Sequence, residues 1–436
     1  MNWRDAVERG PLTGAWQAWN RFWFEPISPV TIALFRILFG ALTLLFVALL
    51  VPDLLVWFSR GGPFTPQDAA NFWGNVPDYS PLLWYPAPGA VIAFFAVFSL
   101  AAFCLMIGLW TRVSALLVFL GLVSIGHRNP LILNGSDWAF RLMAFYLVLA
   151  PCGAALSVDR LRALVRRRAS ARPPLMPPWA QRLLQLQMSL VYATIVFLKL
   201  QGHDWQDGTA LYYTSRLEAF HRFSVPFVFH SLPLVNLLTY WTLAAEIGLA
   251  FLVWVPGLRR FVLLNGVALH VGIEYSMNIP LFAFAMLIWY VTFVDVESWW
   301  ARVQMSWPIR TLSRATLHIH AQHPAAGLVP ALQATDILHR IDAIMLYPAE
   351  HSPGVEDRPT DGLWLVTADG QVFAGEAAFR WLAWRLPVLW PIALLFPLPG
   401  VTAAARRLYR RALQPEHLAT GVPAAAAQIA REQPRS

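Results

Sequence analysis

Residues 180–201 read AQRLLQLQMSLVYATIVFLKLQ, a run long enough to cross a bilayer core, which needs about 20 mainly apolar residues. Its polar and polarisable side chains recur at intervals of three, four and seven residues, and so lie along one face of a helix. They are Gln181, Gln185, Met188, Tyr192 and Lys199, with His203 just beyond. The stretch predicts a spanning helix whose polar face lines a cavity or a helix interface.

The composition of the whole chain also indicates a membrane protein. Of its 436 residues, 57% are hydrophobic and 13% are charged, against roughly 25% charged residues in an ordinary soluble domain. Disorder and a disulfide scaffold are excluded by the apolar content and by the presence of only 2 cysteines. The net charge of +8 comes from arginine blocks between apolar segments, which is a topology signal, so we expect no nucleic-acid partner.

The same length rule gives eight candidate spans along the chain. They cover residues 29–51, 88–110, 112–130, 137–155, 180–201, 232–255, 260–277 and 279–298. Polar residues between 127 and 141 interrupt the third and fourth, so seven or nine spans remain alternatives. We therefore predict an all-α polytopic membrane helical bundle over residues 28–300.

Arginine blocks in short loops predict the orientation of the bundle. The block at residues 159–174 and the pair Arg259 and Arg260 should face the cytoplasm. With eight spans, both termini are then cytoplasmic, and the loops near 52–87, 128–136, 202–231 and 276–279 face outward. We expect a multi-pass protein of the inner (plasma) membrane, with membrane lipids as partners.

Residues 1–27 form a separate segment before the first span. They carry aromatic side chains along one side of a predicted helix: Trp3, Trp16, Trp19, Phe22 and Trp23. Such a pattern is typical of an amphipathic helix at the membrane interface. The segment lacks a short basic n-region and a small-residue cleavage site, so we do not expect a signal peptide.

A small α/β domain is predicted over residues 308–414. The pattern gives a strand at 315–321, a helix at 328–340, a strand at 341–347, a hairpin at 363–374 turning at Asp369-Gly370, and a helix at 376–385. The proline-containing run 386–400 is too short to span and should lie against the membrane, followed by a basic helix with Arg406, Arg407, Arg410 and Arg411. Residues 415–436 are predicted to be a disordered tail.

Ionisable residues inside spans are candidate functional residues, because burying them in lipid is costly. Arg36, Asp137 and Arg141 favour a structural role, the last two as an ion pair within one helix. Glu246 lies in the middle of the sixth span, and His270 and Glu274 stand four residues apart in the seventh. A hydrogen-bonded lining or a proton path suits them better than a metal site, since no metal-binding motif is present.

Lys199 is the sole lysine among 33 basic residues. A lysine in a dry site loses its proton more easily and then serves as a base, which arginine cannot do. The alternative is an amine that reaches out to the headgroups. Since the rest of the chain uses arginine, the retained lysine is a candidate catalytic residue.

The order of these motifs resembles the HTTM (horizontally transferred transmembrane) domain proteins, bacterial relatives of vitamin K-dependent gamma-carboxylase. The resemblance covers about residues 15–298 and rests on Phe35-Arg36-Ile37 with Gly40, Arg128-Asn129 with Asn134 to Asp137, Ser157-Val158-Asp159, Lys199 with Trp205 and Gly208, and Glu246. It implies that Lys199 is the base that removes a proton, with a reduced quinone as the cofactor. Ser136 stands where the carboxylases have a histidine associated with catalysis, which leaves vitamin K and glutamate open as substrates.

The tail resembles the DCC-type thiol-disulfide oxidoreductases, which are thioredoxin-like. In that family a strand runs into a Cys-Pro-x-Cys turn and a helix, whereas this chain has His323-Pro324-Ala325-Ala326. Without a thiolate no exchange chemistry is possible, so the resemblance implies a docking or binding module. His318, His320 and His323 are expected at its surface rather than on a metal.

Two functions remain open at this point. The first is a carboxylase-like lyase whose outward cavity uses Lys199 as general base on a lipophilic or peptide substrate. Its lining would be Arg36, Asp137, Arg141, Tyr192, His203, Trp205, Glu246, His270 and Glu274. The second is a non-enzymatic protein that binds a lipid or quinone or helps to mature a small peptide. A transporter fits less well, because the sequence shows no inverted repeat.

Overall fold

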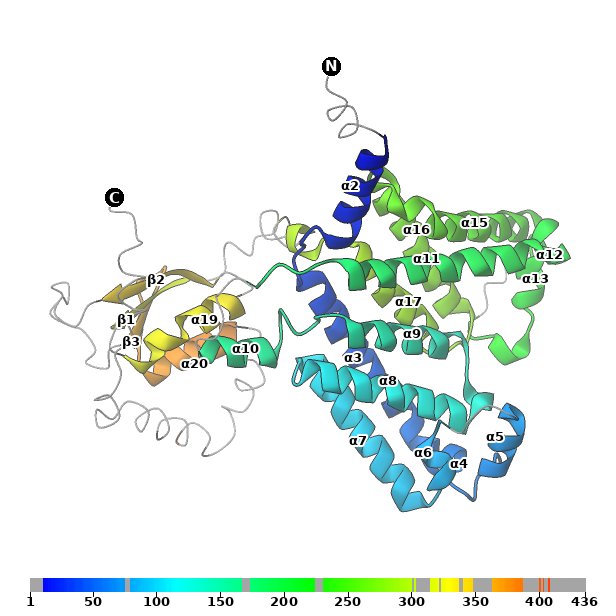
Figure 1. Cartoon of the computed structure of the whole chain (residues 1–436), viewed down its shortest axis with the longest axis horizontal. Coiled ribbons are helices and arrows are strands. Elements are labelled where there is room, and N and C mark those ends of the chain that lie inside the picture. Colours follow the sequence, from blue (N-terminus) through cyan, green and yellow to red (C-terminus); the bar gives the residue numbers. More distant parts are fainter. Residues whose placement is uncertain are drawn as a thin grey trace. The chain divides into compact units, whose positions relative to one another are not determined.

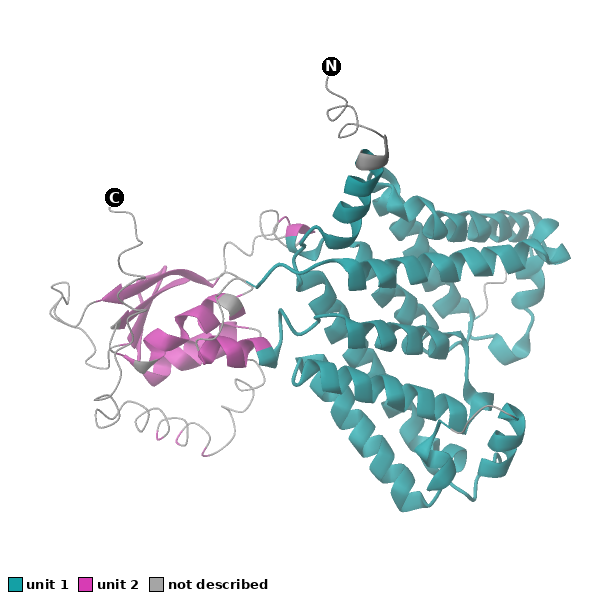
Figure 2. Cartoon of the chain, in the orientation of Figure 1, with its two compact units in different colours: residues 1–159, 173–297 teal, residues 160–172, 298–436 magenta. Residues whose placement is uncertain are grey.

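The structure is a computed structural model that describes residues 11–74, 79–166, 173–223, 230–299, 314–320, 323–336, 340–347 and 363–386, with isolated positions at 302, 400, 403 and 407. The chain divides into two compact units, one of residues 1–159 and 173–297 and one of residues 160–172 and 298–436 (Figure 2). Each unit has a hydrophobic core of its own. They are described separately below.

Unit 1 is a bundle of helices (Figure 1). Its six longest described helices are α3 (Val30–Leu50), α7 (Pro88–Ile107), α8 (Thr111–Arg128), α11 (Trp179–Leu200), α15 (Leu232–Ala250) and α16 (Pro256–Ser276). Three shorter ones, α2 (Pro11–Phe24), α9 (Gly135–Leu149) and α17 (Phe282–Tyr290), pack among them. Helices that follow one another along the chain are mostly neighbours in space: α7 packs on α3 and α8, and α15 packs on α11 and α16.

Short helices connect these long ones. Between α3 and α7 lie η1 (Val51–Asp53), α4 (Leu54–Phe58), α5 (Pro66–Trp73) and α6 (Pro81–Trp84), and η2 (Pro130–Ile132) precedes α9. Between α11 and α15 lie α12 (His203–Gln206), α13 (Ala210–Thr214) and η3 (Glu218–Phe220), while η4 (Leu252–Trp254) precedes α16 and η5 (Val291–Phe293) continues α17. The connections that the sequence places outside the membrane are therefore partly helical.

Five helical segments of the described chain are long and apolar enough to cross a membrane: Val30–Phe58, Pro88–Ile107, Thr111–Arg128, Trp179–Leu200 and Leu232–Ala250. They correspond to five of the eight predicted spans. At the other three positions the structure has α9 with 15 residues, α16 with 21 and α17 with 9. Two of these are short and α16 is too polar, so eight spans are not confirmed.

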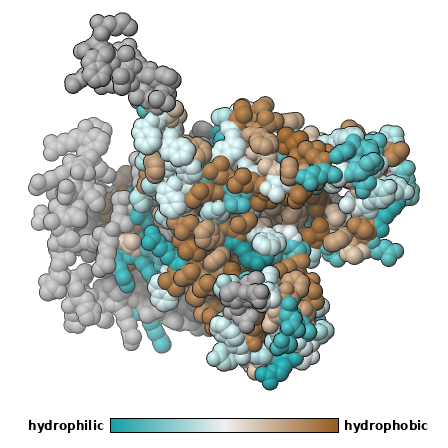
Figure 3. Space-filling view, turned by 45° about the vertical axis from the view of Figure 1, so that its right-hand side comes forward, coloured by the Kyte–Doolittle hydropathy of each residue, from teal (hydrophilic) through white to brown (hydrophobic). Residues whose placement is uncertain are grey.

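The surface of unit 1 is apolar over the helices. Figure 3 shows hydrophobic side chains across the middle of this face, while polar ones gather at its lower and right-hand edges. Phe261, Phe197 and Leu100 are 68%, 63% and 62% exposed. Water-soluble proteins rarely expose such contiguous apolar area. The apolar helices and this surface identify a membrane-embedded protein.

Small residues bring the helices of the bundle close together. A Cβ atom on Gly40 of α3 would lie 2.7 Å from the Cα atom of Met106 in α7. Only glycine permits this contact, and small residues at helix interfaces are the usual means of tight packing in membranes. The glycine in the Phe35–Gly40 motif thus fixes the contact between α3 and α7.

The predicted interfacial segment is helical where it is described. In α2, Trp16 and Trp19 are 64% and 54% exposed. Phe22 instead packs on Trp254, with ring centroids 5.7 Å apart, and Trp3 lies outside the described residues. The helix thus has an outward aromatic side and a side that packs on the bundle.

Unit 2 contains a four-stranded sheet in the order β2-β1-β3-β4. Strands β1 (Ala315–His320) and β2 (Ile341–Tyr347) are parallel, and β3 (Leu363–Thr367) and β4 (Val372–Ala374) form an antiparallel hairpin. Helix α20 (Glu376–Arg385) packs on the hairpin, and α10 (Val158–Val165) contributes residues 160–165 to this unit. The predicted strands, the hairpin and the helix at 376–385 are confirmed.

The predicted helix 328–340 begins and ends earlier in the structure. It consists of η7 (Pro324–Leu328) and α19 (Val329–Thr335). Asp336 ends it, because its carboxylate accepts hydrogen bonds from the amides of Arg340 and Ile341 at 2.7 and 2.8 Å. Most of the predicted proline-containing run and basic helix, and the whole tail, lie outside the described residues.

Candidate functional site

The N-terminal half of the polar face of α11 is a helix interface. The side-chain amides of Gln181 and Gln185 both donate to the carbonyl oxygen of Thr292 in η5, at 2.8 and 2.6 Å. An amide inside a membrane needs such a partner, because lipid offers none. These two glutamines therefore join α11 to the end of α17.

Tyr192 marks the middle of the same face. Its hydroxyl lies 2.7 Å from Nε2 of His270 in α16 and 2.6 Å from the hydroxyl of Tyr290 in α17. The three side chains are 2–4% exposed. Gly266 of α16 makes room for them, since a Cβ atom there would lie 2.8 Å from the Tyr290 hydroxyl oxygen. Three helices thus meet in one buried hydrogen-bonded cluster.

Lys199 lies at the C-terminal end of this face. Its Nζ is 2.6 Å from Oε1 of Glu246 in α15, and the two side chains are 21% and 7% exposed. The same nitrogen lies 4.3 Å from the centroid of the Trp205 ring, which the turn at Gly202 carries back over it. A carboxylate and an aromatic face therefore stabilise the ammonium from two sides.

Glu246, which pairs with Lys199, and His270, which lies against Tyr192, each have one buried polar atom without a hydrogen-bond partner in the described chain. These atoms are Oε2 of Glu246 and Nδ1 of His270. Buried polar groups are nearly always hydrogen-bonded, so each such atom calls for an explanation such as a water or a ligand. The Lys199 site therefore keeps hydrogen-bonding capacity that the protein itself does not use.

Arg36 lies elsewhere in unit 1. Its guanidinium is fully buried and donates to the carbonyl oxygens of Cys152 and Leu156, at 2.8 and 2.5 Å. Both acceptors belong to the turn that follows α9. Arg36 thus fastens α3 to that turn, and its hydrogen bonds do not join it to Lys199 or Glu246.

The predicted ion pair between Asp137 and Arg141 is not formed. Asp137 instead accepts the backbone amide of Asn134 at 2.7 Å and completes a capping box at the start of α9. Arg141 donates to the backbone oxygen of Asp137 at 3.2 Å and lies 4.3 Å above the Trp138 ring. The exposed amides of a helix N-terminus attract a carboxylate, and here they determine its position.

Ser136 belongs to the same cap. Its hydroxyl donates to the side-chain oxygen of Asn134 at 2.7 Å and to the carbonyl oxygen of Pro280 at 3.3 Å. The serine therefore joins the start of α9 to the turn before α17.

Glu274 and His203 also have partners other than Lys199. Glu274 is paired with Arg222, which also donates to the backbone oxygen of Glu274 at 2.9 Å. His203 lies 3.2 Å from Asp207, where both side chains are exposed. Hydrogen bonds from the Thr209 hydroxyl and amide lower the pKa of Asp207. Of the nine predicted lining residues, Glu246 forms an ion pair with Lys199 and Trp205 forms a cation–π contact with it in the described structure.

The described structure also shows which possible metal ligands lie close together. Glu246, His270 and Glu274 do not form a ligand cluster among the described residues, whereas His203, Asp204 and Asp207 have ligand atoms within 4.8 Å of one another. All three are exposed. Exposed acidic groups commonly lie this close without an ion, so this geometry alone assigns no metal.

The site residues predicted from the sequence do not include three residues of these networks: Arg128, Arg222 and Tyr290. Arg128 is fully buried and donates to three carbonyl oxygens, of Phe58, Ser59 and Phe64, at 3.0–3.2 Å. Its position in the polar stretch Arg128-Asn129 was the available signal. Arg222 and Tyr290 gave no local signal, because their partners are 52 and 98 residues away.

The comparisons with known proteins agree with the bundle. No solved structure matches the chain. The HTTM domain family matches residues 24–299, more than half of the chain and all of the residues from Arg36 to Glu274 discussed above. The chain therefore belongs to the HTTM domain family.

Proposed function

We propose that this membrane protein is a carboxylase-like enzyme in which Lys199 acts as general base on a lipophilic or peptide substrate. The observation that carries the proposal is the 2.6 Å contact between Lys199 and a buried carboxylate whose second oxygen, Glu246 Oε2, has no partner. The sole lysine of the chain lies where the family resemblance places the carboxylase base. Arginine in this position would keep the charge but could not serve as a base.

The pair suits proton transfer for a simple reason. An ammonium becomes a base only after it gives up its proton, and Glu246 Oε1 is within hydrogen-bond reach to accept it. The neutral amine then takes a proton from the substrate, and the ammonium formed is stabilised by Trp205. The product is a substrate carbanion or its enolate, the species that a carboxylation requires.

A reduced quinone is the cofactor that the family resemblance implies. Its chemistry fits the residues present, because a quinol has hydroxyl groups that could hydrogen-bond with Glu246 Oε2 and His270 Nδ1, two of the buried atoms without a partner in the described chain. When bound, a reduced quinone would supply the driving force for removing a weakly acidic proton through its own oxidation, for which dioxygen would be the oxidant.

The proposal includes a topology. Helices α9, α16 and α17 with η5 complete an eight-span bundle in the plasma membrane, with both termini in the cytoplasm and Lys199 facing outward. Their packing among the five long apolar helices supports this.

A second candidate is a non-enzymatic protein that binds a lipid or quinone or helps to mature a small peptide. Two observations favour it. Ser136 serves as a helix cap rather than a catalytic group. In unit 2, Nδ1 of His323 accepts the amide of Ala325 at 3.1 Å, at the position where the family resemblance expects a cysteine.

Native mass spectrometry and lipid extraction of the purified protein test the proposal. We expect a co-purifying quinone, peptide or lipid other than a phospholipid in the wild type and in Arg60→Met, an exposed arginine control, and its loss in Lys199→Met. The same ligand in Lys199→Met would contradict the site. Retention of the wild-type cellular phenotype by Lys199→Arg would contradict the role as base and favour the second candidate.

A further inference from the structure

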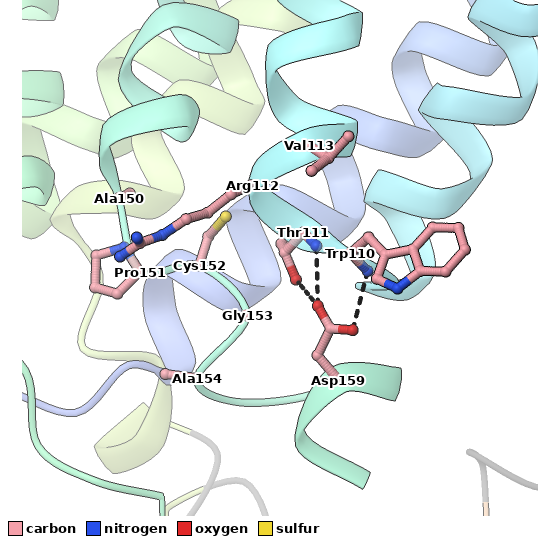
Figure 4. A pocket seen from close by; sticks show the side chains of 10 residues that line it. All are labelled: Trp110, Thr111, Arg112, Val113, Ala150, Pro151, Cys152, Gly153, Ala154 and Asp159. Atoms are coloured by element: carbon pink, nitrogen blue, oxygen red, sulfur yellow. Dashed lines mark hydrogen bonds between the residues drawn. The ribbon is translucent and has the colours of Figure 1, made fainter. Parts of the chain in front are cut away.

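A hollow lies where α7 and α9 end and α8 begins. It has a volume of about 430 Å³ and belongs entirely to unit 1 (Figure 4). Its lining consists of Trp110, Thr111, Arg112, Val113, Ala150, Pro151, Cys152, Gly153, Ala154 and Asp159. None of the proposed base, its carboxylate or its aromatic partner takes part, so this hollow is distinct from the Lys199 site.

The carboxylate in the hollow already caps a helix. Asp159 accepts the backbone amides of Trp110 and Thr111, both at 2.9 Å, and the Thr111 hydroxyl at 2.6 Å (Figure 4). The N-terminus of α8 therefore has its negative partner within the chain. A simple anion would meet this carboxylate, so the hollow does not suit an anion alone.

The guanidinium of Arg112 is the second charge. In Figure 4 its end lies beside Pro151, across the hollow from the Asp159 carboxylate. Arg112 is exposed and forms no hydrogen bond or ion pair with the described part of the chain. One side of the hollow thus offers unused donors for a phosphate, and the other offers a carboxylate.

The rim of the hollow is apolar and lies at the end of two long apolar helices. Trp110 and Val113 are 66% and 58% exposed, and the turn that carries Trp110 connects α7 to α8, both long enough to span. Tryptophan at such a turn is typical of the membrane–water interface. The backbone of Trp110 has a φ of +46°, a left-handed conformation that a bulky residue rarely adopts.

We propose that this hollow binds the headgroup of a phospholipid that carries a primary ammonium. Its phosphodiester would pair with Arg112, its ammonium would approach Asp159, and its acyl chains would follow Trp110 and Val113. The two opposite charges, the unused guanidinium and the apolar rim all fit this zwitterionic ligand. The site is independent of the chemistry proposed for Lys199.

Lipid titration of the delipidated full-length protein, followed by native mass spectrometry, tests this site. The probes are phosphatidylethanolamine, phosphatidylcholine and phosphatidylglycerol with identical acyl chains. We expect phosphatidylethanolamine to bind best, and Arg112→Gln to weaken it about tenfold, as for loss of one charge-assisted hydrogen bond. Arg260→Gln, at another exposed arginine, should bind like the wild type.

A variant that leaves every charge in place separates the hollow from general surface attraction. Ala154→Phe fills the space and should weaken phosphatidylethanolamine to a similar degree. Lys199→Met should bind it normally, so failure of this site and failure of the proposed function are distinguishable. Equal binding of the three lipids, a preference for phosphatidylglycerol, or unchanged binding by Arg112→Gln would each overturn the proposal.

Discussion

Two basic side chains at the ends of spanning helices, Arg128 of α8 and Lys199 of α11, have opposite surroundings. Arg128 is fully buried, and its three nitrogens donate to three backbone carbonyl groups. Lys199 is 21% exposed and pairs with Glu246, which keeps an unpartnered oxygen. The first charge is fully used in holding a loop. Lys199 instead pairs with a titratable group, and one oxygen of that carboxylate has no hydrogen-bond partner in the described chain. A reacting site needs such titratable groups.

The same contrast explains why burial alone is a poor guide to function. Arg36 and Arg128 are the most buried charged residues in the described part of the bundle, and their hydrogen bonds go to backbone oxygens. Carbonyl groups do not titrate, so neither arginine has a partner with which to exchange a proton. The partner of Lys199 does titrate.

The largest expected effect is a loss of stability when Arg128 is replaced. Arg128→Met leaves three carbonyl oxygens without their donor and should destabilise the protein by about 3–5 kcal/mol. Thermal unfolding in detergent measures this. Arg60→Met, at an exposed position of the same loop, should change stability by no more than about 0.5 kcal/mol. A stable Arg128→Met would mean that the loop is held by other contacts.

Lys199→Met should cost less, about 2–3 kcal/mol, because it leaves the buried Glu246 carboxylate without its cation but opens no hydrogen-bonded loop. The double variant Lys199→Met with Glu246→Leu should recover most of this loss. Unfolding of the two single variants and the double variant completes a double-mutant cycle. Additive losses would show that the two side chains do not act as a pair.

Gly266→Ala tests the buried cluster behind Lys199. The new methyl group would lie 2.8 Å from the Tyr290 hydroxyl, which should push Tyr290 away from Tyr192 and cost about 1–2 kcal/mol. Gly272→Ala is the matched control, because the same helix has nothing within 4 Å of a Cβ atom there. Equal stability of the two variants would contradict the tight contact.

The smallest expected effect is a loss of local stability at acid pH in the segment around Asp207. Because the folded-state pKa of Asp207 is lowered by its bonds from Thr209, its contribution is fully present above the unfolded pKa, about 3.9, and is lost as pH falls through the folded value. Hydrogen exchange of residues 203–214, corrected for intrinsic rates, should show weaker protection at acid pH. Asp207→Asn should remove this pH dependence, and a variant that kept it would assign the effect to another group.

The sequence predicted those parts that depend on local pattern. Apolar runs predicted the five long helices, and alternation with Asp369-Gly370 predicted the hairpin of unit 2. The Asp137 cap was also within reach, since Asn134 three residues earlier makes a capping-box pattern. The spacing of Asp137 and Arg141 favours an ion pair, but spacing along a helix takes no account of the unpaired amides at the start of that helix.

The remaining features depend on contacts between distant segments. The Lys199 partner is 47 residues away, and Tyr192 meets Tyr290 across 98 residues. Nothing in the neighbourhood of α9 or α17 shows that a helix of 15 or 9 residues will pack within the bundle. Periodicity finds the face of a helix, whereas the partner of that face is determined by tertiary packing.

The reactivity of the single lysine tests the central claim most directly. A membrane-impermeant amine reagent is added to intact cells and to inside-out vesicles, and the modified residue is mapped by mass spectrometry. We predict modification of Lys199 from the outside, faster in Glu246→Gln because the carboxylate no longer stabilises the ammonium, with Lys199→Arg as the blank. Modification only from the cytoplasmic side, or an equal rate in Glu246→Gln, would contradict an outward-facing base paired with Glu246.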